Sequence, residues 1–402
     1  MPSSISSSDI ASPRPGFIRL TASDRPGIAQ PVPLRDIPAK PWARMLAVAA
    51  SLLLLAIGGW ERRMRALGLE AGDLDDGASF WAEQRRRLDA DGNAIAIVGD
   101  SRILFDTDLD RFAALTGVRP VQLAIAGSNA LPYLENLADA PHFHGLAIVG
   151  IADRSYFRPG AGLGAGALER YRFESPAVRV SFLLHRGLSR RLAFFDDKYR
   201  LNTLVRQMDE GWRPGVVLPV NEILWKLRTT SDDRQSGLWW RDENDVRLRA
   251  HQRAAWQRFV PPIPIETITA MVERTRTAVE KIRARGGDVI FVRPPSAPEL
   301  WVFEEQTVPR ARGWETLLAR AEVRGVHFND YPAMQGLDLP EYSHLSRACA
   351  TVFTDAYVRA LTAITPRLTL SAHAPPALAP ADCSPAPAPP AADRPVDTSK
   401  TK

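Results

Sequence analysis

Short apolar runs recur along the middle of the chain, and turn-forming residues bound them. They cover residues 94–98, 121–125, 146–150, 288–292 and 325–328. The first of them lies between Asp91-Gly-Asn93 and Gly99-Asp-Ser101. A brief apolar run between turn signals is typical of a buried β-strand. We therefore predict a strand at each run.

Helical patterns separate most of these runs, at residues 108–116, 132–138, 265–285, 314–323 and 345–364. Strands that alternate with helices favour an α/β fold with a parallel sheet. We expect the sheet to be doubly wound, with helices on both faces in a three-layer, flavodoxin-like arrangement.

The stretch 158–264 interrupts this alternation. It shows no clear strand, and it contains helical, Arg-rich segments at 178–195 and 218–227 as well as the pair Trp239-Trp240. We predict that this stretch is a helical insertion that covers the sheet.

A long apolar stretch precedes the strands, at residues 41–60. It reaches the roughly 20 residues that a bilayer span needs, if Arg44 snorkels near one end. Trp42 and Trp60 would lie at the two interfaces. A signal peptide is the alternative, but it would begin nearer the N-terminus and end in a small-residue site, whereas this stretch runs into Glu61. We predict one transmembrane helix, and the flanking basic residues do not decide its orientation.

Composition divides the rest of the chain. Residues 1–40 are rich in Ser and Pro and residues 366–402 in Ala and Pro, so we predict two disordered tails. Residues 61–90 would form a linker or juxtamembrane helix, and residues 91–365 the globular domain.

Charge and cysteine content exclude some function classes. The 402 residues carry a net charge of +5, and no basic run is interleaved with aromatic residues, so we predict no nucleic-acid partner. No Cys or His spacing indicates a metal site, and no motif indicates a cofactor. Cys349 lies in an apolar segment and Cys383 in the Pro-rich tail, so we do not expect them to form a disulfide.

Ser101 is a candidate nucleophile, because Gly99-Asp100-Ser101 follows the first predicted strand and starts a helix. In open α/β sheets, ligands bind at the carboxyl ends of the strands. Backbone N–H groups at a helix N-terminus favour negative charge, which suits a serine whose reaction passes through an oxyanion. Helix capping by Asp100 or Ser101 is the alternative.

A candidate base lies near the other end of the domain, in Glu341-Tyr-Ser-His344 before the last predicted helix. Histidine is the commonest base for a serine nucleophile, and a carboxylate on its second nitrogen orients it. Loops from both ends of a parallel-sheet domain reach one edge of the sheet, so we predict that Ser101, His344 and Glu341 meet. A packing histidine and a first-turn acid are the alternatives.

Together these residues resemble the SGNH/GDSL hydrolase superfamily. Gly99-Asp100-Ser101 matches its first block, and Glu341-Tyr-Ser-His344 is similar to its last block, Asp-x-x-His. The resemblance covers about residues 92–152 and 286–362. The branch it is most similar to contains membrane-anchored, extracytoplasmic acyl-transfer proteins, such as the D-alanine transfer protein of teichoic acid modification and O-acetylation proteins of envelope polysaccharides.

The resemblance implies catalysis by Ser101, His344 and Glu341, with the backbone N–H groups of Ser101 and Gly127 as oxyanion donors. Two positions depart from the family pattern. Glu341 replaces the usual Asp, with Asp338 at a less suitable spacing, and Ala152 stands where the third block, Gly-x-Asn, has its Asn. Asn129 is our candidate replacement for that donor.

The resemblance further implies a serine esterase or O-acyltransferase of the bacterial inner membrane, with its catalytic domain in the periplasm or otherwise outside the cytoplasm. Its substrate would be an acylated glycan or a small acyl ester, and a multi-pass membrane protein would be the acyl donor. Two other hypotheses stay open: a non-catalytic SGNH-like scaffold of an envelope polysaccharide assembly, and an unrelated membrane-tethered binding module.

Overall fold

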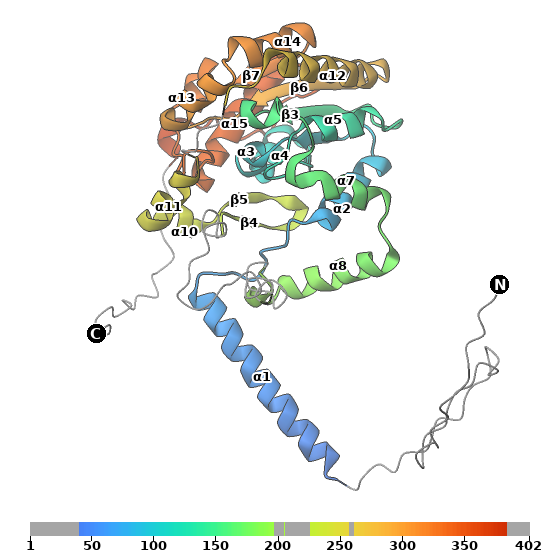
Figure 1. Cartoon of the computed structure of the whole chain (residues 1–402), viewed down its shortest axis with the longest axis vertical. Coiled ribbons are helices and arrows are strands. Elements are labelled where there is room, and N and C mark those ends of the chain that lie inside the picture. The colour runs from blue at the N-terminus through green and yellow to red at the C-terminus, as the bar shows by residue number, and fades with distance from the viewer. Residues whose placement is uncertain (1–39, 197–204, 206–225, 257–260, 384–402) are drawn as a thin grey trace, which may run out of the picture. The chain divides into compact units, whose positions relative to one another are not determined.

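The computed structural model describes residues 40–196, 205, 226–256 and 261–383. Within these residues, one parallel sheet has the strand order β2-β1-β3-β6-β7 (Figure 1). The strands are β1 (Ile95–Val98), β2 (Val121–Gln122), β3 (Leu146–Gly150), β6 (Asp288–Arg293) and β7 (Arg324–His327). The predicted α/β class and parallel sheet are confirmed, although β2 is shorter than its apolar run.

Alternating strand residues enter two separate cores, as the period of two in a strand requires. Val98, Val149 and Phe291 contribute to the first core, and Ile97, Ile148 and Ile290 to the second. Because all of these side chains are fully buried, each strand reads as a continuous apolar run.

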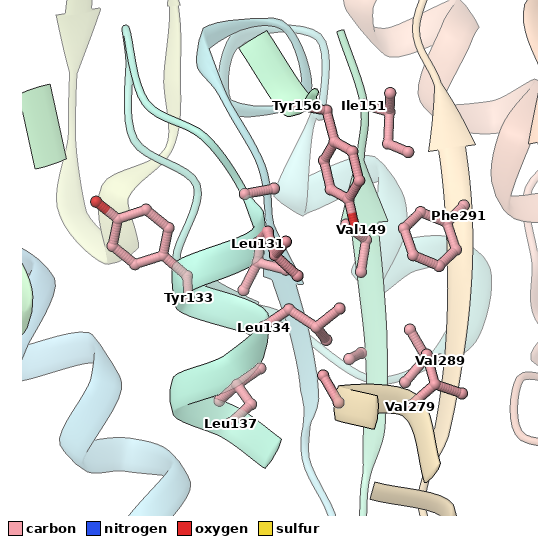
Figure 2. Packing of buried hydrophobic residues seen from close by; sticks show 14 of the residues in the cluster. Leu131, Tyr133, Leu134, Leu137, Val149, Ile151, Tyr156, Val279, Val289 and Phe291 are labelled. Carbon is pink, nitrogen blue, oxygen red and sulfur yellow. The ribbon is translucent and has the colours of Figure 1, made fainter. Parts of the chain in front are cut away.

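Helices cover both cores. α2 (Ala78–Ala90), α5 (Leu131–Ala138) and α12 (Ile265–Ala284) pack into the first, whereas α3 (Ser101–Phe105), α4 (Leu109–Thr116) and α15 (Arg347–Ile364) pack into the second. Figure 2 shows Leu131, Leu134 and Leu137 of α5 directed toward Val149 of β3 and its neighbours. α13 (Pro298–Thr307) follows β6, and α14 (Thr316–Arg320), with the wider helical turn at Ala311–Glu315 before it, precedes β7.

The predicted insertion contains helices, but it also contains strands. α6 (Asp153–Tyr156) lies just before it, and its own helices include α7 (Ala165–Arg172), α8 (Pro176–Ser189), α10 (Trp240–Asn244) and α11 (Val246–Trp256). β4 (Arg228–Thr230) and β5 (Ser236–Leu238) form an antiparallel pair, so the prediction of no strand is wrong. The predicted segment 218–227 lies mostly outside the described residues.

A tertiary contact explains why the β4–β5 pair escaped the sequence pattern. The strands are short and polar, and Arg234 in the turn between them is buried. Its guanidinium donates to the carbonyl oxygens of Gln122 (2.9 Å) and Ala124 (2.8 Å), and it forms an ion pair with Asp76. The pair is therefore held by the contacts of Arg234 as well as by Leu238, the residue of β5 that is buried in the second core.

One helix in the described part of the chain, α1 (Trp42–Ala66), is long and apolar enough to span a membrane. Its 25 residues correspond to about 37 Å of rise. The helix continues past the predicted end at Trp60 to Ala66. The carboxylate of Glu61, the first residue of this extension, accepts the backbone N–H groups of Ala193 and Phe194. Of the predicted linker 61–90, much is helical: the end of α1 and all of α2.

Part of the predicted C-terminal tail is ordered, so that prediction is wrong for residues 366–383. Leu368 is buried in the second core, and Arg111 and Arg359 donate to the carbonyl oxygens of Pro376 and Pro375. The segment returns along α15 and brings Cys383 to Cys349, with which it forms a disulfide. The sequence argument against this disulfide failed because it treated the tail as detached. Residues 384–402, and the first predicted tail up to residue 39, lie outside the described residues.

Candidate active site

Ser101 stands where β1 ends and α3 begins. The Asp100 side chain caps α3 by accepting the N–H of Arg102 (3.0 Å), and its other oxygen accepts the hydroxyl of Ser155 (2.6 Å). Gly99 is required for close packing, since an added Cβ would lie 3.0 Å from the carbonyl oxygen of Gly150. Ser101 itself stays partly exposed, while the remaining residues of α3 are buried. Asp100 is therefore the cap, and Ser101 is left for another role.

His344 and Glu341 form a buried pair just before α15. Nδ1 of His344 lies 2.8 Å from Oε1 of Glu341, and the same oxygen accepts the backbone N–H groups of Ser343 (3.2 Å) and His344 (2.6 Å). Because a carboxylate oxygen only accepts, Nδ1 carries the proton and Nε2 is left with its lone pair. Nε2 is buried and has no hydrogen-bond partner in the part of the chain that the structure describes. The imidazole thus has the tautomer that a general base needs.

A single pocket of about 770 Å³ contains both halves of the predicted site. Ser101, Gly127 and Ala152 line it at the ends of β1, β2 and β3, and His344 lines it from the opposite end of the chain. The loop that carries Ser101 and the loop that carries His344 thus line the same pocket. Among the described residues, no hydrogen bond joins Ser101 to His344. A hydrogen bond between a nucleophile and its base often forms fully only when substrate binds.

The candidate oxyanion donors differ in availability. Gly127 has a φ of 69°, which favours glycine, and its N–H makes no hydrogen bond to a described residue. The N–H of Ser101 is likewise uncommitted at the first position of α3. Asn129 lines the pocket, but its amide donates to the carbonyl oxygens of Tyr156 (2.9 Å) and Arg158. In this structure Asn129 therefore secures the neighbouring loop and has no N–H left for an oxyanion.

Two arginines, Arg154 and Arg158, follow Ala152 in the wall of the pocket. Arg154 is half-buried, Arg158 is exposed, and both line the pocket without an ion-pair partner in the described part of the chain. Burial lowers the pKa of Arg154; Glu304 opposes this effect, and the positive charge of Arg158 adds to it. The pocket wall near Ala152 therefore offers positive charge in place of an amide.

A buried set of side chains beneath Ser101, the arginine cluster, consists of Arg102, Arg293, Glu304 and Asp153. Arg293 pairs with Glu304 and Asp153 at 2.7 Å each, and Arg102 pairs with the other oxygen of Glu304. Ser296 links the two arginines by hydrogen bonds to both. Burial raises the pKa of Glu304, but Arg102 and Arg293 lower it more, to about 2. These four residues thus carry two positive and two negative charges.

A second set next to His344, the carboxyl cluster, consists of Glu341, Asp106 and Asp242. Asp106 accepts the N–H of Leu345 (2.9 Å), yet burial raises its pKa well above the usual range, and Glu341 adds to the rise. Burial also raises the pKa of Asp242 to about 8, with Gln252 opposing and Glu341 adding. Burial thus favours the neutral, protonated form of Asp106 and Asp242 beside Glu341.

The insertion holds the loop that carries His344. Trp256 at the end of α11 donates its indole N–H to Oε2 of Glu341, the oxygen that does not face His344. Arg253 donates to the carbonyl oxygen of Pro340 (2.9 Å), and Arg249 pairs with Asp338 (3.1 Å). Asp338 is thus engaged at the surface, and Glu341 is the acid that orients the histidine.

Sequence reasoning did not predict the contact of Trp256 with Glu341, and it missed the arginine cluster. Two signals were present: an arginine directly after Ser101, and another at the end of the apolar run that became β6. Neither signal identifies the distant partner of the arginine. No group of three or more His, Cys, Asp or Glu residues that could hold a metal ion is found among the described residues.

We compared the chain with models of known protein families and with curated proteins. No model of a known protein family matches the chain, and no curated protein matches it either.

Proposed function

We propose that this protein is a membrane-anchored serine esterase or O-acyltransferase of the SGNH type. One observation carries the proposal: the buried His344–Glu341 pair leaves Nε2 without a hydrogen-bond partner among the described residues, and His344 lines the same pocket as Ser101. The strand order β2-β1-β3-β6-β7 is that of one common doubly wound fold, and it supports an SGNH arrangement.

The reaction would proceed by acyl transfer. Nε2 of His344 takes the proton of Ser101 as its oxygen attacks an ester carbonyl, and Glu341 stabilises the imidazolium that forms. The N–H groups of Ser101 and Gly127 donate to the developing oxyanion. His344 then protonates the departing alcohol, which leaves Ser101 acylated. Water or a sugar hydroxyl then attacks the acyl carbon and gives its proton to His344, and His344 passes a proton to Oγ of Ser101 as the acyl group leaves it.

The proposed substrate is an acyl ester of an envelope polysaccharide or a related glycan, and the proposed acyl donor is a multi-pass membrane protein. The resemblance of the motifs supports both, and the pocket has room for a sugar ester. A domain outside the cytoplasm is supported by the Cys349–Cys383 disulfide, because disulfides persist in oxidising compartments. α1 would anchor the protein in the inner membrane.

Replacement of Ser101 by Ala should abolish labelling by a fluorophosphonate probe and reduce ester hydrolysis by at least about 10³-fold, since it removes the nucleophile. Labelling of the full chain is measured by fluorescence after gel electrophoresis, and Ser128→Ala serves as the matched control. Ser128 follows Gly127 in the same pocket, but its hydroxyl is bound to the carbonyl oxygen of Ile125 (2.7 Å). Equal labelling of wild type and Ser101→Ala would refute the assignment.

A second candidate function is a non-catalytic scaffold of the same fold. Ala152 in the place of an oxyanion donor and the unengaged Ser101 favour it. Wild type that resists the probe, while Ser101→Ala folds normally, would select this alternative.

A further inference from the structure

α8 turns an apolar face to the solvent. Val180, Leu184 and Leu188 lie on successive turns and are 55%, 65% and 45% exposed, and Phe173 just before the helix is 77% exposed. The spacing of four residues places Val180, Leu184 and Leu188 on one side of the helix. We call these four residues the α8 stripe. An exposed apolar stripe of this kind marks an interaction site.

The opposite face of α8 fixes the helix to the domain. The ring of Phe182 packs at 5.8 Å from that of Phe80, and Arg186 forms an ion pair with Glu83 on α2. Ser189 at the end of α8 is buried, and its carbonyl oxygen accepts the N–H of Gly72 (2.8 Å). The stripe therefore faces outward because the other side of the helix is already in contact with the domain.

Unpaired basic residues flank the stripe. Arg172, Arg179 and Arg191 are exposed, and none of them has an ion-pair partner among the described residues. An apolar face with arginines beside it is typical of helices that lie in a membrane interface, where the cations meet anionic headgroups.

The chain holds the end of α8 next to the end of the anchor. Glu61 of α1 accepts the N–H groups of Ala193 (3.0 Å) and Phe194 (3.1 Å), a few residues after α8. Arg65 donates to the carbonyl oxygen of Arg191 (3.4 Å). The uncharged part of α1 ends at Trp60, so the surface of a bilayer that α1 crosses lies close to Glu61. This contact keeps the end of α8 at the same level.

We propose that α8 is an interfacial helix that lies in the surface of the bilayer crossed by α1. The α8 stripe enters the acyl-chain region, and Arg172, Arg179 and Arg191 contact anionic phosphate headgroups. The inference rests on α1 as the anchor and is independent of the proposed chemistry. Asp196, which lines the candidate active-site pocket, follows this segment directly, so the contact would hold one end of the pocket near the membrane.

The test uses the full chain in nanodiscs of phosphatidylcholine with phosphatidylglycerol. A nitrobenzoxadiazole dye is attached at Val180→Cys, and the two native cysteines are protected as a disulfide. The matched control is Val246→Cys, an exposed valine on α11. We expect the dye at position 180 to emit at shorter wavelength and several-fold more strongly than at 246. Lipids brominated near the headgroup should quench it more than lipids brominated at the chain end.

Dye attached at Leu54→Cys, within the apolar part of α1, reports whether the anchor is inserted. If position 54 is quenched and position 180 behaves like position 246, the stripe does not touch lipid, and the proposal is overturned in favour of a protein partner. If brominated lipids do not quench the dye at position 54, α1 is not inserted in the bilayer, and the proposal is also overturned. Combined Arg172→Gln, Arg179→Gln and Arg191→Gln substitution should weaken quenching at position 180 in nanodiscs that contain phosphatidylglycerol, but not in pure phosphatidylcholine.

Discussion

Two buried clusters of ionisable side chains flank the candidate site, and they satisfy their charge in opposite ways. In the arginine cluster, Arg102 and Arg293 pair with Glu304 and Asp153, so every member has a partner of the opposite sign. The carboxyl cluster contains no arginine or lysine. There, Glu341 is stabilised by His344, Trp256 and two backbone N–H groups. One carboxylate oxygen of Asp106, like one of Asp153, has no hydrogen-bond partner among the described residues.

This difference indicates what stabilises the structure around Ser101 and what stabilises it around His344. The cluster beneath Ser101 is rigid and charged, because breaking a buried ion pair leaves an uncompensated charge. In the carboxyl cluster, burial favours the neutral form of Asp106 and Asp242 beside Glu341. Ionisation of either acid would place a second negative charge near Glu341, and repulsion would disfavour it. We therefore expect the Ser101 side to determine stability and the His344 side to determine how the site responds to pH.

The largest effect is expected when the arginine cluster is broken. Glu304→Gln removes the shared partner of Arg102 and Arg293 and should lower the free energy of unfolding by about 3–5 kcal/mol. The measurement is denaturant unfolding followed by circular dichroism. Glu299→Gln, on the exposed side of the same helix, should change it by less than about 0.5 kcal/mol. An unfolding midpoint for Glu304→Gln equal to that of wild type would show that the cluster is not charged as described.

Neutralisation of one member of the carboxyl cluster should give a smaller, pH-dependent effect. The pKa of Asp242 is raised to about 8, so the folded protein retains a proton that the unfolded chain loses near pH 4. The contribution of Asp242 to the free energy of unfolding should therefore become less favourable as pH rises from about 4 to 8. Asp242→Asn removes this dependence and should unfold at higher temperature than wild type at pH 8, with little difference at pH 4.

The control for a general charge effect is Asp110→Asn, which neutralises an exposed acid. If Asp242→Asn and Asp110→Asn shift the melting temperature equally at all pH values, Asp242 is not protonated in the folded protein.

The smallest effect is expected at the link between the insertion and Glu341. Trp256→Phe keeps the ring but removes the N–H donor to Oε2, and the loss of a hydrogen bond to a charged group should lower kcat roughly tenfold. The matched control is Trp240→Phe, since the indole nitrogen of Trp240 is buried without a hydrogen-bond partner. Ester hydrolysis and melting temperature are measured for both. Unchanged kcat in Trp256→Phe would mean that Glu341 is oriented without the insertion.

The sequence by itself determined the elements whose signal is local. Strands 94–98, 146–150 and 288–292 were predictable because a buried parallel strand must be apolar at every position. Ser101 and the Glu341–His344 pair were recognisable because each motif lies within four consecutive residues next to a strand or a helix. The helix long enough to span a membrane was predictable from the number of consecutive apolar residues in its segment.

Only the tertiary structure decided what depends on residues far apart in the chain. Arg102 meets Glu304, Trp256 meets Glu341, and Cys383 returns to Cys349, each across many residues whose path no local pattern specifies. The same is true of Asn129, whose amide is taken by a loop that the sequence leaves unplaced. Apolar periodicity reports burial, whereas the partner of a buried polar group is chosen by the packing of the whole domain.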